Sequence, residues 1–594
     1  MRTLTAFLVL GILLNLFSIA SAGSTMNDTQ KLKAFFTDEW EYQLKQSPLQ
    51  ATNIGDPRYN ALLDDFSIDA VKADQKHDAE ALSRLHAISR TDLSDPDKLN
   101  YDLFERNLKL AIEGQQFHSY LMPITQLHGV QQTLPQLPQF TQFVHLKDYE
   151  DYLQRMSKIP VGIDQIIATM KQGLVEKITP PRITLRDVGA QIKSQVVSKP
   201  EDSSFYQPFK DFADGISQAD QDRLRKSAAS VISTEVVPAY QKLFDFWDKE
   251  YYPNTREKIG ASDLPNGAAW YAYRVKWETT TDLTPQQIHE IGLQEVKRIR
   301  AEMDQVIQST GFKGNFDDFV RFLRTDPQFF YTKPEDLLTG YRDICKRIDA
   351  QLPLFFGKLP RLTYGVREVP AFSAPSQTTA YYDIGSVKAG RPGWFCANTY
   401  KLDTRPKWEM EALSMHESVP GHHLQLALAQ EMENVPEFRR YSGYTAFVEG
   451  WGLYSESLGP DMGMYKDPYS KFGQLTYEIW RAIRLVVDTG MHSMGWTRQQ
   501  AIDYFKSNSA KMENDIVVEI DRYIVWPGQA LAYKLGELKI KELKKYSQDQ
   551  LGDRFDIREF HDHVLENGAV PLTILEAQIK AYVAAKKNQP ATKT

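Results

Sequence analysis

The sequence predicts a mainly helical protein that carries one small β-sheet. Apolar residues recur at intervals of three and four, as on one face of an α-helix; the first such run comprises Leu32, Phe35, Phe36, Trp40 and Leu44. Helix-capping patterns mark several helix starts further along. Only residues 362–400 combine aromatic and β-branched residues with Gly and Pro, which is typical of short strands and hairpins.

The start of the chain has the pattern of a secretory signal, Met1–Ala22. Arg2 supplies a positive charge, Leu4–Ala20 is mostly apolar, and Ala20-Ser21-Ala22 offers small residues for cleavage. The apolar run is short for a membrane anchor, no basic stop-transfer flank follows it, and no cysteine lies nearby to carry a lipid. We therefore predict cleavage after Ala22, a periplasmic or secreted protein, and no stable membrane anchor.

The composition is that of a large globular protein, with 42% hydrophobic and 25% charged residues. The net charge is −7 and there is no basic tract, which argues against nucleic acid as a partner. Cys345 and Cys396 could form one disulfide or remain free, so the chain is not a disulfide scaffold. No internal repeat and no long low-complexity linker interrupts the sequence.

Capping signals fix where several helices begin. Ser217 and Asp220 have the spacing of a capping box. At Thr284-Pro285-Gln286-Gln287 an N-cap residue, a proline at the first helical position and a glutamine at the third coincide. We expect a long helix from there to about Ser309. Thr497 caps a further helix near the C-terminal end.

The stretch Met415–Gln425 begins as a zinc-peptidase signature, in which two histidines one helical turn apart bind Zn²⁺ and an intervening glutamate is the general base. His416 and Glu417 fit this start, but Pro420 stands where the second histidine belongs. In a straight helix His422 would face roughly 120° away from His416, and His423 would lie ~10 Å along the axis. Neither could share one metal ion with His416 in that geometry.

A break in the helix would resolve this. Pro420 removes a backbone donor and Gly421 tolerates unusual φ values, so we expect a kink or bulge at these two residues. Two extra residues in the turn would put His422 in the direction of the metal. We therefore predict His422 as the second ligand. His423 is the fallback ligand and otherwise a substrate-contacting residue on the wall of the cleft.

A carboxylate is needed as the third ligand, because catalytic zinc sites often combine two histidines with a carboxylate. We predict Glu449, which follows after a turn at Asn434–Pro436 and a returning helix. Gly450 and Gly452 would let this helix pack closely against the metal helix. Glu456 is the competing carboxylate, or a partner that orients one of the ligands.

These two stretches, HESVPGHHLQ and EGWGLYSE, resemble a bacterial family known as domain of unknown function 885, which is grouped with the gluzincin-like metallopeptidases. Further similar stretches are Leu264–Gly267, Arg391–Asn398, Asp488–His492 and Arg522–Tyr533. The resemblance implies a large two-lobed helical metallopeptidase-like fold with a deep cleft, distantly like carboxypeptidase Taq and neurolysin-type peptidases. It also implies that residues 23–594 form one domain.

In metallopeptidases of this type an edge strand beside the metal helix pairs with the extended substrate backbone. We assign that role to Trp394–Tyr400, and Asn398 within it is a candidate substrate-binding residue.

The candidates for contact with the substrate further along are His492, Arg522, Tyr523 and Tyr533. Asp488 and His492 share one helical face, so the carboxylate could orient the histidine as an oxyanion donor; a plain surface ion pair is the equal alternative. Arg522 could anchor a substrate carboxylate, and Tyr523 or Tyr533 could hydrogen-bond the tetrahedral intermediate, although packing explains all three equally well.

Together these residues predict an exported zinc peptidase that acts on peptides, most plausibly short ones. Zn²⁺ held by His416, His422 and Glu449 would lower the pKa of a water toward ~7, and Glu417 would take its proton. One alternative is a metal-dependent hydrolase of a non-peptide amide or ester. The other is a peptide-binding protein without turnover, which Glu417 argues against because a structural metal site needs no general base.

Overall fold

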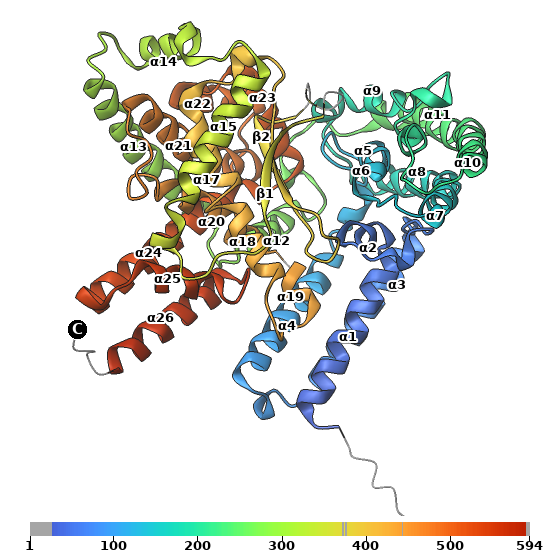
Figure 1. The fold of residues 1–594 in the computed structure, drawn as a ribbon, viewed down its shortest axis with the longest axis horizontal. Helices are drawn as coiled ribbons and strands as arrows, with labels where there is room; N and C mark the ends of the chain where they lie inside the picture. The colour runs from blue at the N-terminus through green and yellow to red at the C-terminus, as the bar shows by residue number, and fades with distance from the viewer. Residues whose placement is uncertain (1–25, 371–373, 375–376, 442, 590–594) are drawn as a thin grey trace, which may run out of the picture.

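The computed structural model describes residues 26–370, 374, 377–441 and 443–589. The predicted signal, residues 1–22, lies outside the described residues. Within the described part of the chain the fold is mainly helical with one three-stranded sheet, as the sequence predicts (Figure 1). No helix in this part is both long and apolar enough to cross a membrane.

The N-terminal part of the chain builds two groups of helices. The first group comprises α1 (Asp28–Gln46), α2 (Pro48–Ile54), α3 (Ile68–His86) and α4 (Asp95–Gln115). The second comprises α5 (Val130–Thr133), α6 (Leu137–Phe140), α7 (Leu146–Met156), α8 (Ile159–Glu176), α9 (Val188–Lys193), α10 (Gln218–Val231) and α11 (Val237–Phe246). This second group lies at the right of Figure 1 and has a hydrophobic cluster of its own.

The sheet follows a further run of helices: α12 (Gly267–Thr279), α13 (Pro285–Ser309), α14 (Phe316–Thr325), α15 (Pro334–Asp349) and α16 (Leu352–Phe355). Its strands are β1 (Tyr364–Glu368), β2 (Ala380–Asp383) and β3 (Gly393–Ala397). The spatial order is β1-β3-β2, with β3 parallel to β1 and antiparallel to β2. The predicted strand region is therefore confirmed, and β2 is left as an edge strand.

The C-terminal part carries the predicted metal residues. Its helices are α17 (Met410–Glu417), α18 (His422–Gln430), α19 (Glu437–Tyr441), α20 (Thr445–Ser457), α21 (Pro468–Ser493), α22 (Arg498–Asn508), α23 (Glu513–Val525), α24 (Ala532–Leu551), α25 (Ile557–Leu565) and α26 (Leu572–Asn588). The long helix α21 is buried along most of its length and packs against α13, α17, α23 and α24. It forms the support on which the site is assembled.

The predicted helix caps are confirmed. The Ser217 hydroxyl accepts from the backbone N–H of Asp220, and Thr284 forms a complete capping box at the start of α13. Helix α13 ends at Ser309, in agreement with the predicted end at about this residue. Thr497 caps α22 in the same way.

Candidate metal centre

The expected bulge at Pro420-Gly421 is a complete break between two helices. Helix α17 ends at Glu417 and α18 begins at His422. The Trp451 indole N–H donates to the Pro420 carbonyl over 2.8 Å, which ties the connection to α20. A Cβ on Gly421 would stand 1.9 Å from the carbonyl oxygen of His416, so the tight return of the chain requires glycine here.

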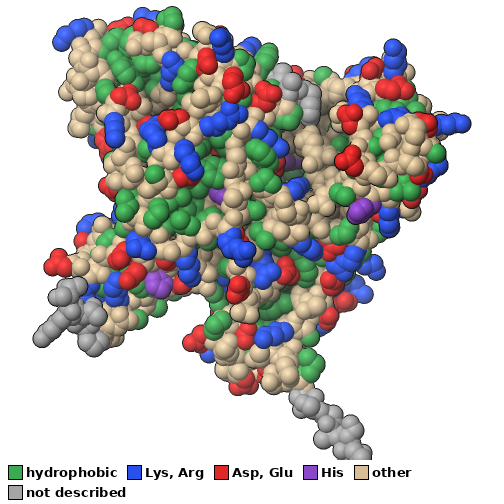
Figure 2. Space-filling view, in the orientation of Figure 1, with side chains coloured by type: hydrophobic (Ala, Val, Ile, Leu, Met, Phe, Trp, Pro, Cys, Tyr) green, Lys and Arg blue, Asp and Glu red, His purple; other side chains and the backbone are tan. Residues whose placement is uncertain are grey.

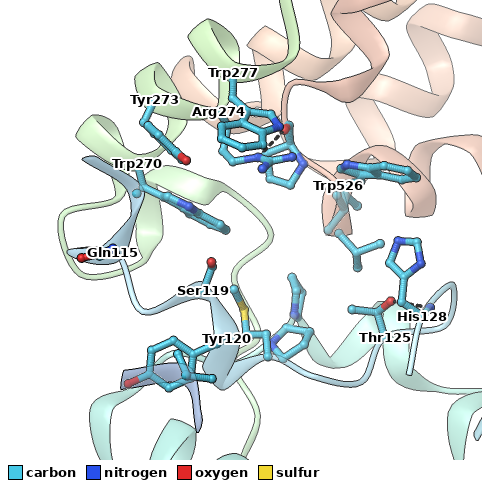
Figure 3. Close-up of a pocket in the computed structure, with 18 of the residues that line it drawn as sticks. Gln115, Ser119, Tyr120, Thr125, His128, Trp270, Tyr273, Arg274, Trp277 and Trp526 are labelled. Carbon is cyan, nitrogen blue, oxygen red and sulfur yellow. Dashed lines mark hydrogen bonds between the residues drawn. The ribbon is translucent and has the colours of Figure 1, made fainter. Parts of the chain in front are cut away.

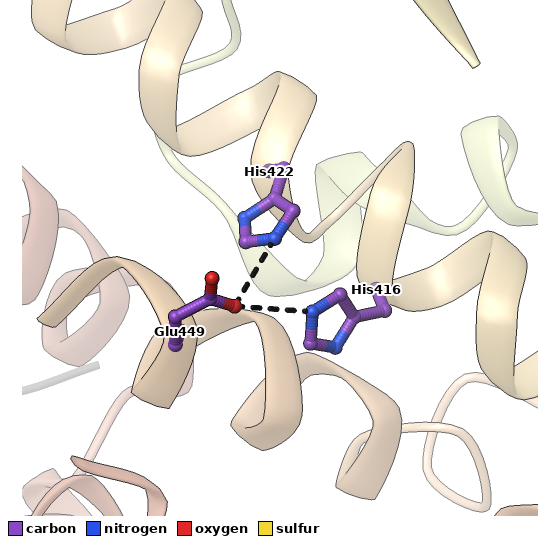
Figure 4. Close-up of side chains that lie close together, drawn as sticks. All are labelled: His416, His422 and Glu449. Carbon is purple, nitrogen blue, oxygen red and sulfur yellow. Dashed lines mark ion pairs between the residues drawn. The ribbon is translucent and has the colours of Figure 1, made fainter. Parts of the chain in front are cut away.

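This break brings His416 and His422 together with Glu449 of α20 (Figure 4). One carboxylate oxygen, Oε2 of Glu449, lies 3.5 Å from Nε2 of His416 and 3.5 Å from Nε2 of His422. Tetrahedral zinc binds nitrogen and oxygen at ~2.0–2.2 Å, which spaces neighbouring ligand atoms roughly 3.3–3.6 Å apart. The donor types and both carboxylate–histidine distances therefore fit a zinc ion held by two histidines and a carboxylate, and all three donor atoms lie within 4.8 Å of one another.

Glu456 is a partner of the site rather than a third donor. Its Oε1 accepts from Nδ1–H of His416 over 2.8 Å, and its side chain is fully buried. A carboxylate in this position fixes the orientation and tautomer of a ligating histidine. Burial alone would lower the pKa of His416, but the hydrogen bonds to Glu449 and Glu456 outweigh it and raise the pKa to about 9. Burial would also raise the pKa of Glu449, yet its two histidine partners hold it well below the usual range.

The two glycines of α20 pack against different neighbours. A Cβ on Gly452 would stand 2.8 Å from Cε1 and 2.9 Å from Nε2 of His416, so this glycine makes room for the ligand. A Cβ on Gly450 would instead meet the backbone of Gly536 in α24 at 2.5 Å. The prediction is confirmed for Gly452 and wrong for Gly450, because α20 presents opposite faces to α17 and α24.

His423 points away from the metal ligands and toward the sheet. Its Nδ1 lies 2.8 Å from the Tyr382 hydroxyl and its Nε2 lies 3.1 Å from the Leu362 carbonyl. Its ring also packs on that of Tyr364. Burial lowers its pKa to about 4. Both ring nitrogens are engaged in structural hydrogen bonds, so the prediction that His423 contacts substrate is corrected.

A cavity of about 420 Å³ opens beside the three potential ligands. His416, His422, Glu449 and Glu417 all line it, and Glu417, the last residue of α17, is only half-buried. Figure 2 shows that the surface of this face is hollowed between the sheet and the α5–α11 group. The residue expected to act as general base therefore faces the same cavity as the metal residues.

The strand beside this cavity is β2, not the predicted segment Trp394–Tyr400. Residues 377–382 line the cavity, whereas β3 is paired on both sides and has no free edge. The side-chain amide of Asn398 donates to the carbonyls of Ala374, Gln377 and Thr378. Asn398 is thus buried behind the cavity wall, where it holds the segment that leads into β2, and its predicted contact with substrate is corrected.

His492 does not reach the site. Its Nδ1 accepts from the backbone N–H of Ala261 over 3.0 Å, and its Nε2–H donates to the Tyr523 carbonyl over 2.9 Å. Burial lowers its pKa to about 4, which keeps the ring neutral. Asp488 is bound by the Tyr271 hydroxyl and the Gly528 N–H instead of orienting His492. The prediction that His492 is an oxyanion donor is therefore wrong. The alternative of a surface ion pair is also wrong, because both side chains are buried.

The two candidate tyrosines have different surroundings. Tyr523 is buried outside the cavity lining, and its hydroxyl accepts from Trp480 and from Arg484. Tyr533 lines the cavity, and its ring stacks beside that of His416 with centroids 6.4 Å apart. Its hydroxyl accepts from Arg522 and from Gln529, which leaves its own proton to donate. The geometry therefore favours Tyr533 and excludes Tyr523 as a direct contact.

Several cavity residues were missed as site residues by the sequence reasoning. They are Arg481 and Arg484 of α21, Lys511 before α23, and the residues around β2. A pair of arginines three residues apart within an otherwise apolar helical stretch was the available signal. Arg522 lines the same cavity, in agreement with its candidate role.

A second cavity, of about 440 Å³, shares Trp526 with the first. Aromatic side chains form part of its walls, with Tyr120, Trp270, Tyr273 and Trp277 shown in Figure 3. None of the described residues around it forms a group that could hold a metal ion. The candidate metal residues thus belong to the first cavity.

Comparisons with known proteins agree on the fold. The family model described as "Bacterial protein of unknown function (DUF885)" matches residues 48–579. A crystal structure of a candidate lipoprotein from Colwellia psychrerythraea is similar with a TM-score of 0.90 and 28% identity, covering 94% of this chain and 100% of that one. The structure of a candidate lipoprotein of unknown function from Shewanella oneidensis has a TM-score of 0.65 and 16% identity over the same shares, a likeness in fold alone. No curated protein matches the chain.

Proposed function

We propose that this chain, which belongs to the DUF885 family of bacterial proteins, is a zinc-dependent hydrolase that cleaves peptide bonds. One observation carries the proposal: His416, His422 and Glu449 converge at zinc-like spacing in a cavity that Glu417 also lines. A structural zinc site is usually closed by four protein ligands, whereas a catalytic one has three and an open position. Three donors at the floor of an open cavity match the catalytic type.

The chain's own residues would divide the work as follows. His416, oriented by Glu456, and His422 with Glu449 would hold the ion. A bound zinc ion supplies the acidity that lets a water molecule attack a carbonyl carbon at neutral pH. Glu417 would accept the proton of that water and pass it to the amine as the C–N bond breaks. Tyr533 would donate its free hydroxyl proton to the carbonyl oxygen as negative charge develops there.

The substrate backbone would lie along β2. This strand is bonded to β3 on one side only among the described strands, and residues 377–382 face the cavity. An extended peptide can add to such an edge through main-chain hydrogen bonds, which bind the peptide backbone whatever its side chains are. Within this proposal the fold is gluzincin-like, with the α5–α11 group and the C-terminal helices as two lobes around a cleft.

We also place the protein outside the cytoplasm. The sequence-based signal at residues 1–22 supports export, and both similar structures are of candidate lipoproteins. Peptides in the periplasm or outside the cell would then be the available substrates.

The decisive experiment compares the mature protein with Glu417→Gln, using a mixed peptide library with and without a chelator. Glu437→Gln, a half-exposed change on α19, is the matched control. We expect Glu417→Gln to retain zinc and to lose cleavage by about 10²–10⁴-fold. Turnover of simple esters or amides with peptides left intact would instead favour the non-peptide hydrolase. Peptide binding without any turnover would indicate a binding protein.

A further inference from the structure

One wall of the site cavity is strongly basic. Arg481 and Arg484 of α21, Lys511, and Arg522 of α23 all line the same cavity as the metal residues. Arg481 and Arg484 stand three residues apart, so they lie on one face of α21. They are 4% and 2% exposed, which is unusual for arginine unless it is paired.

The carboxylates nearby do not satisfy this wall. Glu519 is shared between Arg484, at 3.0 Å, and Arg522, at 3.3 Å. Lys511 is paired with Glu409 at 3.1 Å. Arg481 lies 3.9 Å from Glu456, which is already bound to a potential metal ligand, and shares the charge of Glu519 with Arg484 and Arg522.

Two guanidinium donors on this wall are buried and unused. Nε of Arg481 and Nη1 of Arg484 have no hydrogen-bond partner among the described residues. The remaining contacts of Arg484, through Nε to the Tyr523 hydroxyl at 2.8 Å and through Nη2 to Glu519, hold its guanidinium in place. A buried donor without a partner costs stability, so two such donors on residues that line a cavity point to a ligand that supplies acceptors once the side chains adjust to it.

The basic wall also lies close to the metal residues. The Tyr533 ring stacks beside His416 at 6.4 Å and lies 4.2 Å from the guanidinium carbon of Arg484. Glu456 connects His416 with Arg481 on the other side. A ligand that places a carbonyl at the metal residues therefore places its next few atoms at the arginines.

We propose that Arg481 and Arg484, with Arg522 beside them, bind the C-terminal carboxylate of a peptide substrate, so that the enzyme removes residues from the C-terminal end. Arginine binds carboxylates through charge-assisted and often bidentate hydrogen bonds, which the two unused donors would complete. Every unblocked peptide ends in such a group, whereas side-chain carboxylates occur in only some peptides.

This inference rests on the proposed function for the cleavage step. In that step water adds its oxygen to the carbonyl carbon, the C–N bond breaks, and the amine leaves with the C-terminal carboxylate after taking up the proton.

The test measures binding and cleavage separately. Binding of a pentapeptide with a free C-terminus, and of the same peptide as its C-terminal amide, is titrated calorimetrically with zinc-loaded Glu417→Gln protein. We expect the free acid to bind at least about tenfold more tightly, because the amide lacks the charge that the arginines recognise. Arg481→Gln and Arg484→Gln should each remove this difference. Arg321→Gln, an exposed change on α14, should not.

The arms of the experiment separate the competing explanations. If Glu417→Gln protein with its arginines unchanged binds the free acid and the amide equally well, the inference is overturned. This comparison does not depend on how the arginine variants fold. An amidated peptide that ends in Glu and binds as tightly as the free acid overturns the C-terminal assignment. Selective binding without cleavage by the wild-type protein leaves the carboxylate site standing and refutes the proposed hydrolase. Cleavage of the free acid and the amide at equal rates refutes the carboxylate site and leaves the proposed hydrolase standing.

Discussion

His422 and His423 are neighbours in α18 with different surroundings. The alanine variant of His422 should lose zinc affinity, and that of His423 should lose folding stability. His422→Ala removes one of three donor atoms that converge at zinc-like spacing. A structural zinc site supplies about 10–16 kcal/mol through its four ligands, so one ligand is worth roughly 3–4 kcal/mol, or about 10²–10³-fold in affinity. In the metal-free protein this change removes the pairing of His422 with Glu449 but no hydrogen bond at Nδ1, which has no partner among the described residues, so stability should fall less than in His423→Ala.

His423→Ala has the opposite effect. It removes hydrogen bonds to Tyr382 and Leu362, worth about 1 kcal/mol each, and a buried ring whose loss leaves a cavity. We expect the free energy of unfolding to fall by about 3–5 kcal/mol while the zinc affinity stays within a few-fold of wild type.

Competition with a chromophoric chelator measures the zinc affinity, and denaturant unfolding without metal measures the stability. His86→Ala, an exposed change on α3, controls for the loss of a histidine far from the site. If His423→Ala lost zinc while His422→Ala kept it, the assignment of the ligands from this geometry would be refuted.

Four further substitutions test other parts of the structure. Glu456→Gln should weaken zinc binding about 10–100-fold by removing the carboxylate that orients His416, and an unchanged affinity would contradict that role. Tyr533→Phe should lower kcat/KM by about 10²-fold with little change in Tm, whereas Tyr523→Phe should lower the free energy of unfolding by about 1–3 kcal/mol; the reverse pattern would exchange their roles. Burial raises the pKa of Asp488 from 3.8 to about 7, so its ionisation opposes folding and stability is lost as the pH rises from about 4 through 7. Asp488→Asn should therefore flatten the decline of Tm between pH 5 and pH 8, and a slope equal to that of wild type would rule the effect out.

Local signals predicted the secondary structure well. The cap at Thr284 and the end of α13 at Ser309 depend on contacts within a few residues, and these are present in the sequence itself. The same holds for the break at Pro420-Gly421, because the backbone limits of proline and glycine do not depend on the rest of the fold. This local break was enough to predict His422 rather than His423 as the residue that faces Glu449.

The sequence did not predict which elements distant along the chain pack against each other. Asp488 and His492 have the helical spacing of an interacting pair, yet both are buried on α21 and bind the backbones of distant segments. The segment Trp394–Tyr400 has the composition of a strand, but pairing on both sides makes β3 central and leaves the edge to β2. Helical spacing and strand composition describe a residue's immediate neighbours and carry no information about which distant element packs against it.

The sequence by itself determined the helical class, the capped starts of several helices and the donor types at the candidate metal centre, because each depends on interactions within a turn or two of the chain. Only the tertiary structure decided which carboxylate accompanies the histidines. Glu449 and Glu456 lie two turns apart on α20, and the packing of α20 against α17 directs one to the Nε2 side and the other to the Nδ1 side of His416. It also decided that Arg481 and Arg484 face the cavity, because the side of a buried helix that meets an opening is set by all the elements packed around it.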